Sequence, residues 1–217
     1  MSEDIFKLIE AAKDNPDIFR KEYIYTQKQS IEINNLIDKI IENDYETSKD
    51  QGDALERLID KIFKLHKIYK VKKNLKTSTN EIDLFLELDF FGDQMNRIIE
   101  KSCLENEVLI ECKNYKSRLG VTWIGKFASL LRVSQTKVGL FISKNGITGQ
   151  NEWLDSKGLI RKIALRDGNL ILDFELSDFR NLEGKTLFDC LRIKKQSLEK
   201  DVEIDSLIEP HELEDTF

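Results

Sequence analysis

Three residues on two predicted strands combine two carboxylates with a lysine, a set that can bind a cation and activate water. Asp83 lies in the alternating segment 82–90, and Glu111 and Lys113 lie in segment 108–113. Side chains two positions apart on a strand share a face, so Glu111 and Lys113 lie on the face opposite Cys112. Carboxylates from neighbouring strands suit a hard cation such as Mg²⁺. A lysine beside them can orient a water molecule and offset charge that builds on a phosphate.

The elements that must position these residues can be predicted from apolar spacing. A helix is expected where apolar residues recur with a 3.6-residue period, and a strand where they alternate or form a short continuous run. The predicted helices are the first 45 or so residues, a segment from residue 52 to 63 that contains Glu56, and residues 121–132, 149–157 and 175–181. Besides the two strands above, the predicted strands are residues 68–73, 138–142 and 169–173.

The order of these segments resembles the PD-(D/E)xK nuclease superfamily, in its Mrr-like restriction endonuclease branch. Glu111-Cys112-Lys113 matches the ExK half of the motif, and Asp83 matches the preceding acid. Gly52-Asp53-Ala54-Leu55-Glu56 is similar to the start of the first family helix, and Val138-Gly139-Leu140-Phe141-Ile142-Ser143 is similar to a later core strand. The resemblance covers roughly residues 52–165. Ile82 stands where many members have proline, and the 28 residues from Asp83 to Glu111 require a long excursion between the strands.

This resemblance implies a fold, an activity and a cofactor. The fold would be α/β, a restriction-endonuclease-like αβββαβ core with a mixed central sheet flanked by helices and an N-terminal helical extension. The activity would be cleavage of DNA with Mg²⁺ or, as a substitute, Mn²⁺, in restriction or phage defence. Asp83 and Glu111 would hold the metal, Glu56 would assist, and Lys113 would position the water. A surface ion pair between Glu111 and Lys113 is the alternative, worth only about 0–1 kcal/mol.

Charge is unevenly distributed along the chain, although the net charge is −6. Residues 1–60 carry −7, residues 61–198 carry +8 and residues 199–217 carry −7. A basic middle segment between acidic ends is expected of a protein whose middle binds a polyanion. The candidate phosphate contacts are basic residues of this segment, namely Lys72, Lys73, Lys116, Arg118, Lys126, Arg132 and Lys144. For Lys126 an ordinary solvent-exposed helix residue is the alternative.

Composition excludes several other classes of protein. The 3 cysteines have no CxxC spacing, which argues against a zinc ribbon or a disulfide framework, and 2 histidines are too few for histidine-based hydrolysis. We expect no membrane association and a cytoplasmic location, because the chain has no long apolar run and its first residues include two acids. We expect three parts: a helical extension at 1–48, a nuclease-like domain at 49–198 and an acidic tail at 199–217.

Two alternatives to a restriction nuclease remain open at this point. One is a Holliday-junction-resolvase-like or repair nuclease on the same core, which a preference for branched DNA would indicate. The other belongs to a different class, a non-catalytic nucleic-acid-binding or assembly protein on a nuclease core, with its N-terminal helices docked on a protein partner. The complete acid, acid and lysine set favours the enzyme. A homodimer would supply two cuts for two DNA strands.

Overall fold

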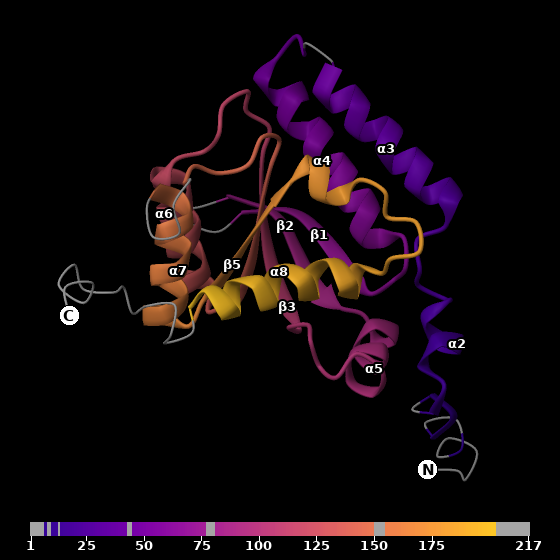
Figure 1. The fold of residues 1–217 in the computed structure, drawn as a ribbon. Coiled ribbons are helices and arrows are strands. Elements are labelled where there is room, and N and C mark those ends of the chain that lie inside the picture. Colours follow the sequence, from indigo (N-terminus) through magenta and orange to yellow (C-terminus); the bar gives the residue numbers. More distant parts are fainter. Residues whose placement is uncertain are drawn as a thin grey trace, which may run out of the picture.

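The computed structural model describes residues 7, 10–12, 14–42, 45–76, 81–149 and 155–202. Its elements appear in the following order (Figure 1): α2 (Pro16–Arg20), α3 (Gln27–Glu42), α4 (Ser48–Lys64), β1 (Tyr69–Lys76), β2 (Glu81–Leu88), α5 (Phe90–Ile98), β3 (Glu107–Lys113), α6 (Val121–Ser134), β4 (Val138–Ser143), α7 (Asp155–Asp167), β5 (Leu170–Glu175), the 3₁₀ helix η1 (Leu176–Phe179) and α8 (Leu187–Asp201). The predicted acidic tail lies outside the described residues from residue 203 onward.

A mixed five-stranded sheet with the order β1-β2-β3-β4-β5 forms the centre of the fold. The first three strands pair antiparallel, and β3, β4 and β5 pair parallel. Parallel neighbours need crossover connections, which α6 and α7 provide. The predicted α/β core with a mixed sheet is therefore confirmed, with α5 as an additional helix in the connection between Asp83 and Glu111.

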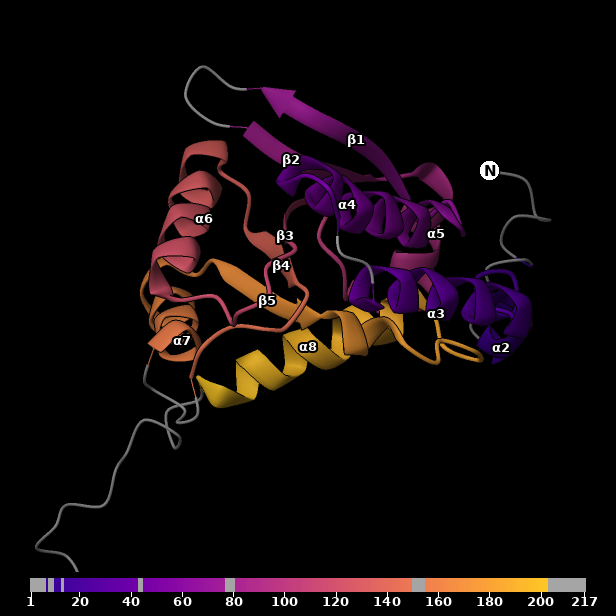
Figure 2. The same cartoon turned by 90° about the horizontal axis from the view of Figure 1, so that it is seen from above.

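Helices cover both faces of the sheet. Figure 2 shows α6 and α7 together on one side of the strands, whereas α4 and α8 lie on the other side. The helix α4 packs on β1, β2 and β3, and α3 packs on the outside of α4. The strand β4 is buried along its whole length, as expected of a central parallel strand whose two faces are covered. The active-site candidates on β2 and β3 therefore rest on a rigid scaffold.

Local sequence explains where the helices near the site begin. Thr47 caps α4 by accepting a hydrogen bond from the backbone N–H of Asp50. Asp89 caps α5 in the same way through the N–H of Phe90. The prediction that Phe90 continues the strand at residues 82–90 is therefore wrong, because the Asp89 cap starts a helix there. The side chain of Phe90 is 78% exposed instead of buried.

The C-terminal half of the domain departs further from the predicted elements. The helix predicted at 149–157 begins at Asp155, and residues 150–154 lie outside the described residues. The helix predicted at 175–181 is the single 3₁₀ turn η1. The helix α8 was not predicted, and it starts at a capping box made by Thr186 and Asp189.

A short pairing joins two distant parts of the chain. Ile24 forms an antiparallel bridge with Thr186. Beside it, the N–H of Tyr25 donates to the carbonyl of Lys185 at 2.9 Å, and the N–H of Gly184 donates to the carbonyl of Tyr25 at 3.0 Å. The segment between α2 and α3 is thereby fixed to the start of α8. Within the described residues, no helix is long and apolar enough to cross a membrane.

Candidate active site

The strand register brings Asp83 and Glu111 together. Leu84 pairs with Ile110 across the antiparallel β2–β3 ladder, which sets Asp83 opposite Glu111 on the same face. Asp83 is fixed further by its Oδ2, which accepts a hydrogen bond from the backbone N–H of Cys112 at 2.7 Å. The two acids predicted from sequence therefore meet at the centre of the sheet. Cys112 lies on the opposite face and is buried, which raises the pKa of its thiol.

Lys113 joins both carboxylates. Its Nζ lies 2.6 Å from Oε1 of Glu111 and 3.4 Å from Oδ2 of Asp83. All three side chains are largely buried, with 15–17% of their surface exposed. Burial alone would lower the pKa of Lys113, but the negative charges of Glu111 and Asp83 outweigh it, and the pKa is raised. Lys113 is therefore a fully charged ammonium group held between two acids.

Glu56 on α4 belongs to the same electrostatic environment. Burial, followed by the charges of Asp83 and Asp53, raises its pKa to about 7, although Lys113 and Lys73 partly oppose this. A carboxyl group whose pKa is raised by a neighbouring acid lies in an excess of negative potential. The structure thus places Glu56 near enough to Asp83 for the charge of Asp83 to act on it.

A reciprocal amide contact ties α4 to the end of β3. The side chain of Asn114 donates to the carbonyl of Gln51 at 2.6 Å, and the side chain of Gln51 donates to the carbonyl of Asn114. Gln51 lies in the first turns of α4, five positions before Glu56, and Asn114 directly follows Lys113. This pair of contacts fixes the helix that carries Glu56 relative to the strand that carries the lysine. This contact could not be predicted from the sequence, because no local pattern pairs two amides so far apart in the chain.

Trp123 in the first turn of α6 forms a wall of the site. The Nζ of Lys113 lies 5.5 Å from the centre of a Trp123 ring, and the Nζ of Lys126 lies 5.3 Å from it, both within the range of a cation–π contact. The ring of Tyr115 packs against Trp123 with centroids 5.4 Å apart. Tyr115 is 46% exposed, so it presents an aromatic surface beside the candidate site.

The predicted phosphate contacts fall into two groups. Lys116, Arg118 and Lys126 are exposed near the site, after β3 or on α6. The second group, Lys72, Lys73, Arg132 and Lys144, lies elsewhere and makes the following contacts within the protein. Lys72 pairs with Glu87 at 3.0 Å and Lys73 with Asp60 at 2.7 Å, and Arg132 pairs with Asp167. Lys144 donates to the carbonyls of Ile40 and Ile41 at 2.9 and 3.2 Å, at the C-terminal end of α3.

The donor set was compared with what a divalent cation requires. Among the described residues, no group of three or more His, Cys, Asp or Glu side chains is already arranged around a possible ion position. Asp83 and Glu111 are nevertheless adjacent, the pKa of Glu56 is raised by burial and by the charge of Asp83, and oxygen ligands are what Mg²⁺ prefers. The residues therefore fit a hard cation held by Asp83 and Glu111, with Glu56 as the additional acid.

The chain was compared with known proteins. The Mrr_cat family model, described as restriction endonuclease, matches residues 48–174, which is more than half of the chain. A search of curated proteins finds no match. Among solved structures, the DNA modification-dependent restriction endonuclease AspBHI aligns with a TM-score of 0.41 and 11% identity, over 84% of this chain and 42% of that chain. This chain thus spans less than half the length of that structure. By the family match, it belongs to the Mrr-like restriction endonuclease family of nucleases.

Proposed function

We propose that this protein is a metal-dependent DNA endonuclease that hydrolyses phosphodiester bonds, in restriction or phage defence. The observation that carries the proposal is the position of the Lys113 ammonium, 2.6 Å from Glu111 and 3.4 Å from Asp83. Such a group on a central strand is costly to bury unless it has a function. Family membership supports the nuclease class, and DNA is the substrate expected for that class.

Each acidic or basic side chain of the site can be given a separate role in hydrolysis. Lys113 orients the attacking water and offsets charge that develops on the phosphate. Asp83 and Glu111, with Glu56, would hold Mg²⁺ or Mn²⁺. When bound, such an ion polarises the phosphate and favours deprotonation of a water. Asp83 is held for this role by the Cys112 amide, and Glu56 by the Gln51–Asn114 contact.

DNA binding is proposed for the exposed residues that surround the site. Lys116 and Arg118 follow β3 and Lys126 lies on α6, so the three lie on elements that border Lys113. Contacts of this type bind phosphate and supply little sequence information. Cutting both strands of a duplex needs two sites, so we propose a homodimer, which sedimentation analysis with and without DNA would test.

The decisive experiment incubates the purified protein with supercoiled, linear and branched DNA in Mg²⁺, Mn²⁺ or EDTA. The wild type is compared with Lys113→Ala and with Lys162→Ala, a matched control at an exposed position on α7. Cleavage that needs metal and is lost only in Lys113→Ala supports the proposal. A strong preference for branched DNA would favour a junction-resolving or repair nuclease. Absence of cleavage with every substrate would favour a non-catalytic binding or assembly protein.

A further inference from the structure

A second polar site lies at the opposite end of β3 from Lys113. The strand runs from Glu107 to Lys113, so the two ends are about 20 Å apart at 3.3 Å per residue. A cavity of about 560 Å³ opens beside the segment that precedes β3, within the range of small-molecule sites. Four cationic residues from three parts of the chain line it, namely Arg20, Lys101, Arg192 and Lys195.

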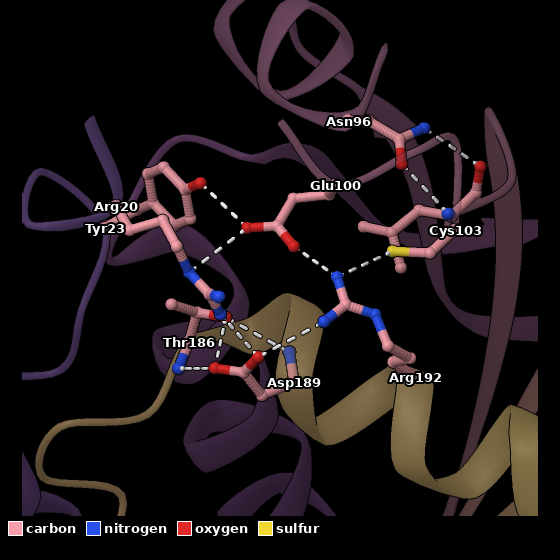
Figure 3. Close-up of polar contacts among 9 residues, drawn as sticks. Arg20, Tyr23, Asn96, Glu100, Cys103, Thr186, Asp189 and Arg192 are labelled. Carbon is pink, nitrogen blue, oxygen red and sulfur yellow. Dashed lines mark hydrogen bonds and ion pairs between the residues drawn. The ribbon is translucent and has the colours of Figure 1, made fainter. Parts of the chain in front are cut away.

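A buried acid holds the two arginines in place (Figure 3). Glu100 is only 4% exposed and contacts both of them, with Nε of Arg20 at 3.4 Å and Nη2 of Arg192 closer. The hydroxyl of Tyr23 also donates to Glu100, at 2.9 Å. Asp189 contacts the same arginines from the other side, at 2.6 Å from Arg20 and 3.5 Å from Arg192. Carboxylates that hold a guanidinium in this way fix its direction before any ligand arrives.

These contacts leave one donor nitrogen of each arginine available to a ligand. Among the described residues, Nη1 of Arg20 and Nε of Arg192 make no hydrogen bond or ion pair. Glu100 has its oxygens engaged and its side chain only 2% exposed, so it presents almost no charge to the cavity. Lys101 is exposed, and Lys195 lies 3.4 Å from Glu105 at the rim. The lining therefore sets four cationic residues against two acids, Glu100, whose oxygens are engaged, and Glu199, so the cavity carries a net positive charge.

The loop that presents Lys101 is unusually constrained. Lys101 and Ser102 both have left-handed backbones, with φ of 56° and 54°, a conformation that costs energy for residues other than glycine. The buried Asn96 holds the loop by donating to the carbonyl of Leu104 and accepting from its N–H, both at 3.0 Å. Strained backbone that is held by buried polar contacts is concentrated at functional sites.

We propose that this cavity binds a small phosphate-bearing anion, separately from DNA at the catalytic site. Nη1 of Arg20 and Nε of Arg192 can donate to phosphate oxygens, and the lysines add charge. The described lining contains no aromatic side chain, so recognition rests on the phosphoryl group and not on stacking of a base. The ligand would contact Arg20 before α3, Lys101 between α5 and β3, and Arg192 on α8, and it would strengthen the docking of all three segments.

Inorganic pyrophosphate is the probe, titrated calorimetrically into the full chain in EDTA at constant ionic strength. We expect saturable binding and a rise in Tm, because a ligand that binds only the folded state stabilises it. The double variant Lys101→Ala/Lys195→Ala should bind at least 5-fold more weakly, and Arg192→Lys should also weaken binding because it retains charge but loses the Nε donor. The control Lys162→Ala should bind like the wild type, and the Tm of each variant without ligand reports whether it is folded.

Three results would overturn the proposal. One is the absence of saturable binding by the wild type. Another is unchanged binding in the folded double variant. The third is evidence that the anion binds at the DNA surface. Either loss of binding in Lys113→Ala or stoichiometric displacement of pyrophosphate by a short duplex DNA would provide it. The proposal does not depend on nuclease activity, since the titration contains no metal and no cleavage step.

Discussion

Lys113 lies with its Nζ 2.6 Å from Oε1 of Glu111, two residues earlier on the same strand, and both side chains are largely buried. This pairing is the structural form of the sequence motif that suggested a nuclease. It also defines the most direct test of the catalytic assignment.

Replacing Lys113 by alanine should reduce the rate of DNA cleavage by about 10² or more, the range expected when a group that assists proton transfer or charge stabilisation is removed. The affinity for DNA at fixed salt should change little, because the exposed basic residues remain. Single-turnover cleavage and a separate binding assay in EDTA measure the two effects. Near wild-type cleavage by Lys113→Ala would remove this residue from the mechanism.

Two substitutions of Asp83 can separate the effect of its charge on cleavage from the effect of its hydrogen bond on stability. Asp83→Asn retains an oxygen that can accept the hydrogen bond of the Cys112 amide but loses the negative charge, so folding should be preserved and cleavage lost. Asp83→Ala leaves that amide without its partner and should also lower the free energy of unfolding by about 1–3 kcal/mol. Urea unfolding of both variants checks this difference. Equal stability of the two variants would show that the 2.7 Å contact contributes nothing.

Glu56 should make the stability of the metal-free protein depend on pH. Its pKa rises from 4.5 to about 7 on folding, so the native state holds the proton more tightly than the unfolded chain. The contribution of Glu56 to stability is therefore fully present below about pH 4.5 and is lost as the pH rises to about 7. Glu56→Gln should remove this loss and gain on the order of 1 kcal/mol relative to wild type between pH 5 and 8, allowing for screening at a partly exposed site.

The measurement for Glu56 is urea unfolding in EDTA at pH 5 and pH 8. Glu107→Gln, at an exposed position on β3, is the control and should follow the wild type at both values. A pH-independent difference between Glu56→Gln and wild type would contradict the raised pKa.

Lys144 should act mainly on stability and little on DNA binding. Its ammonium donates to the last carbonyls of α3, so Lys144→Met should lower the free energy of unfolding by about 1–3 kcal/mol. The salt dependence of DNA binding should stay as in the wild type. Lys116→Met should instead reduce the slope of log K against log salt by about 0.9 if it neutralises one phosphate. A reduced slope in Lys144→Met would show instead that Lys144 contacts a DNA phosphate.

Gly92 on α5 and Gly125 on α6 form a matched pair for testing how closely α5 packs against the backbone of Ile68. A Cβ on Gly92 would lie 2.0 Å from the carbonyl oxygen of Ile68, whereas a Cβ on Gly125 meets nothing within 4 Å. Gly125→Ala should therefore stabilise the protein by about 0.5–1 kcal/mol, the usual preference of a helix for alanine. Gly92→Ala should destabilise it by more than that amount, because backbone atoms must move apart. Thermal unfolding of both variants would show opposite signs.

The sequence predicted those strands and helices whose apolar residues follow a local periodic pattern. Alternation at residues 82–88 and the apolar run at 138–142 identified β2 and β4, and the period-2 rule identified which side chains of β3 share a face. The position of Asp83 opposite Glu111 followed only from the register. Glu56 could be assigned to a helix from sequence, but its approach to Asp83 depends on how α4 packs on the sheet.

Contacts between distant segments could not be predicted in this way. The buried Glu100 is in an unremarkable polar stretch, and its partners Arg20 and Arg192 lie in other parts of the chain. Phe90 continued the alternation of its strand, but the preceding Asp89 supplied a helix cap that outweighed it. The helix α8 was overlooked although Thr186 and Asp189 form a capping box that can be read from sequence.

The bridge between Ile24 and Thr186 has a consequence for synthesis of the protein. The sheet strands pair with neighbours in chain order, so each can join a partner that has already emerged from the ribosome. Ile24 and Tyr25 have no such neighbour and must wait for residues 184–186, which at about 5–20 residues per second takes on the order of ten seconds or more. During that interval Tyr25 lacks its backbone partners, and the segment between α2 and α3 would be the part of the chain most open to a chaperone.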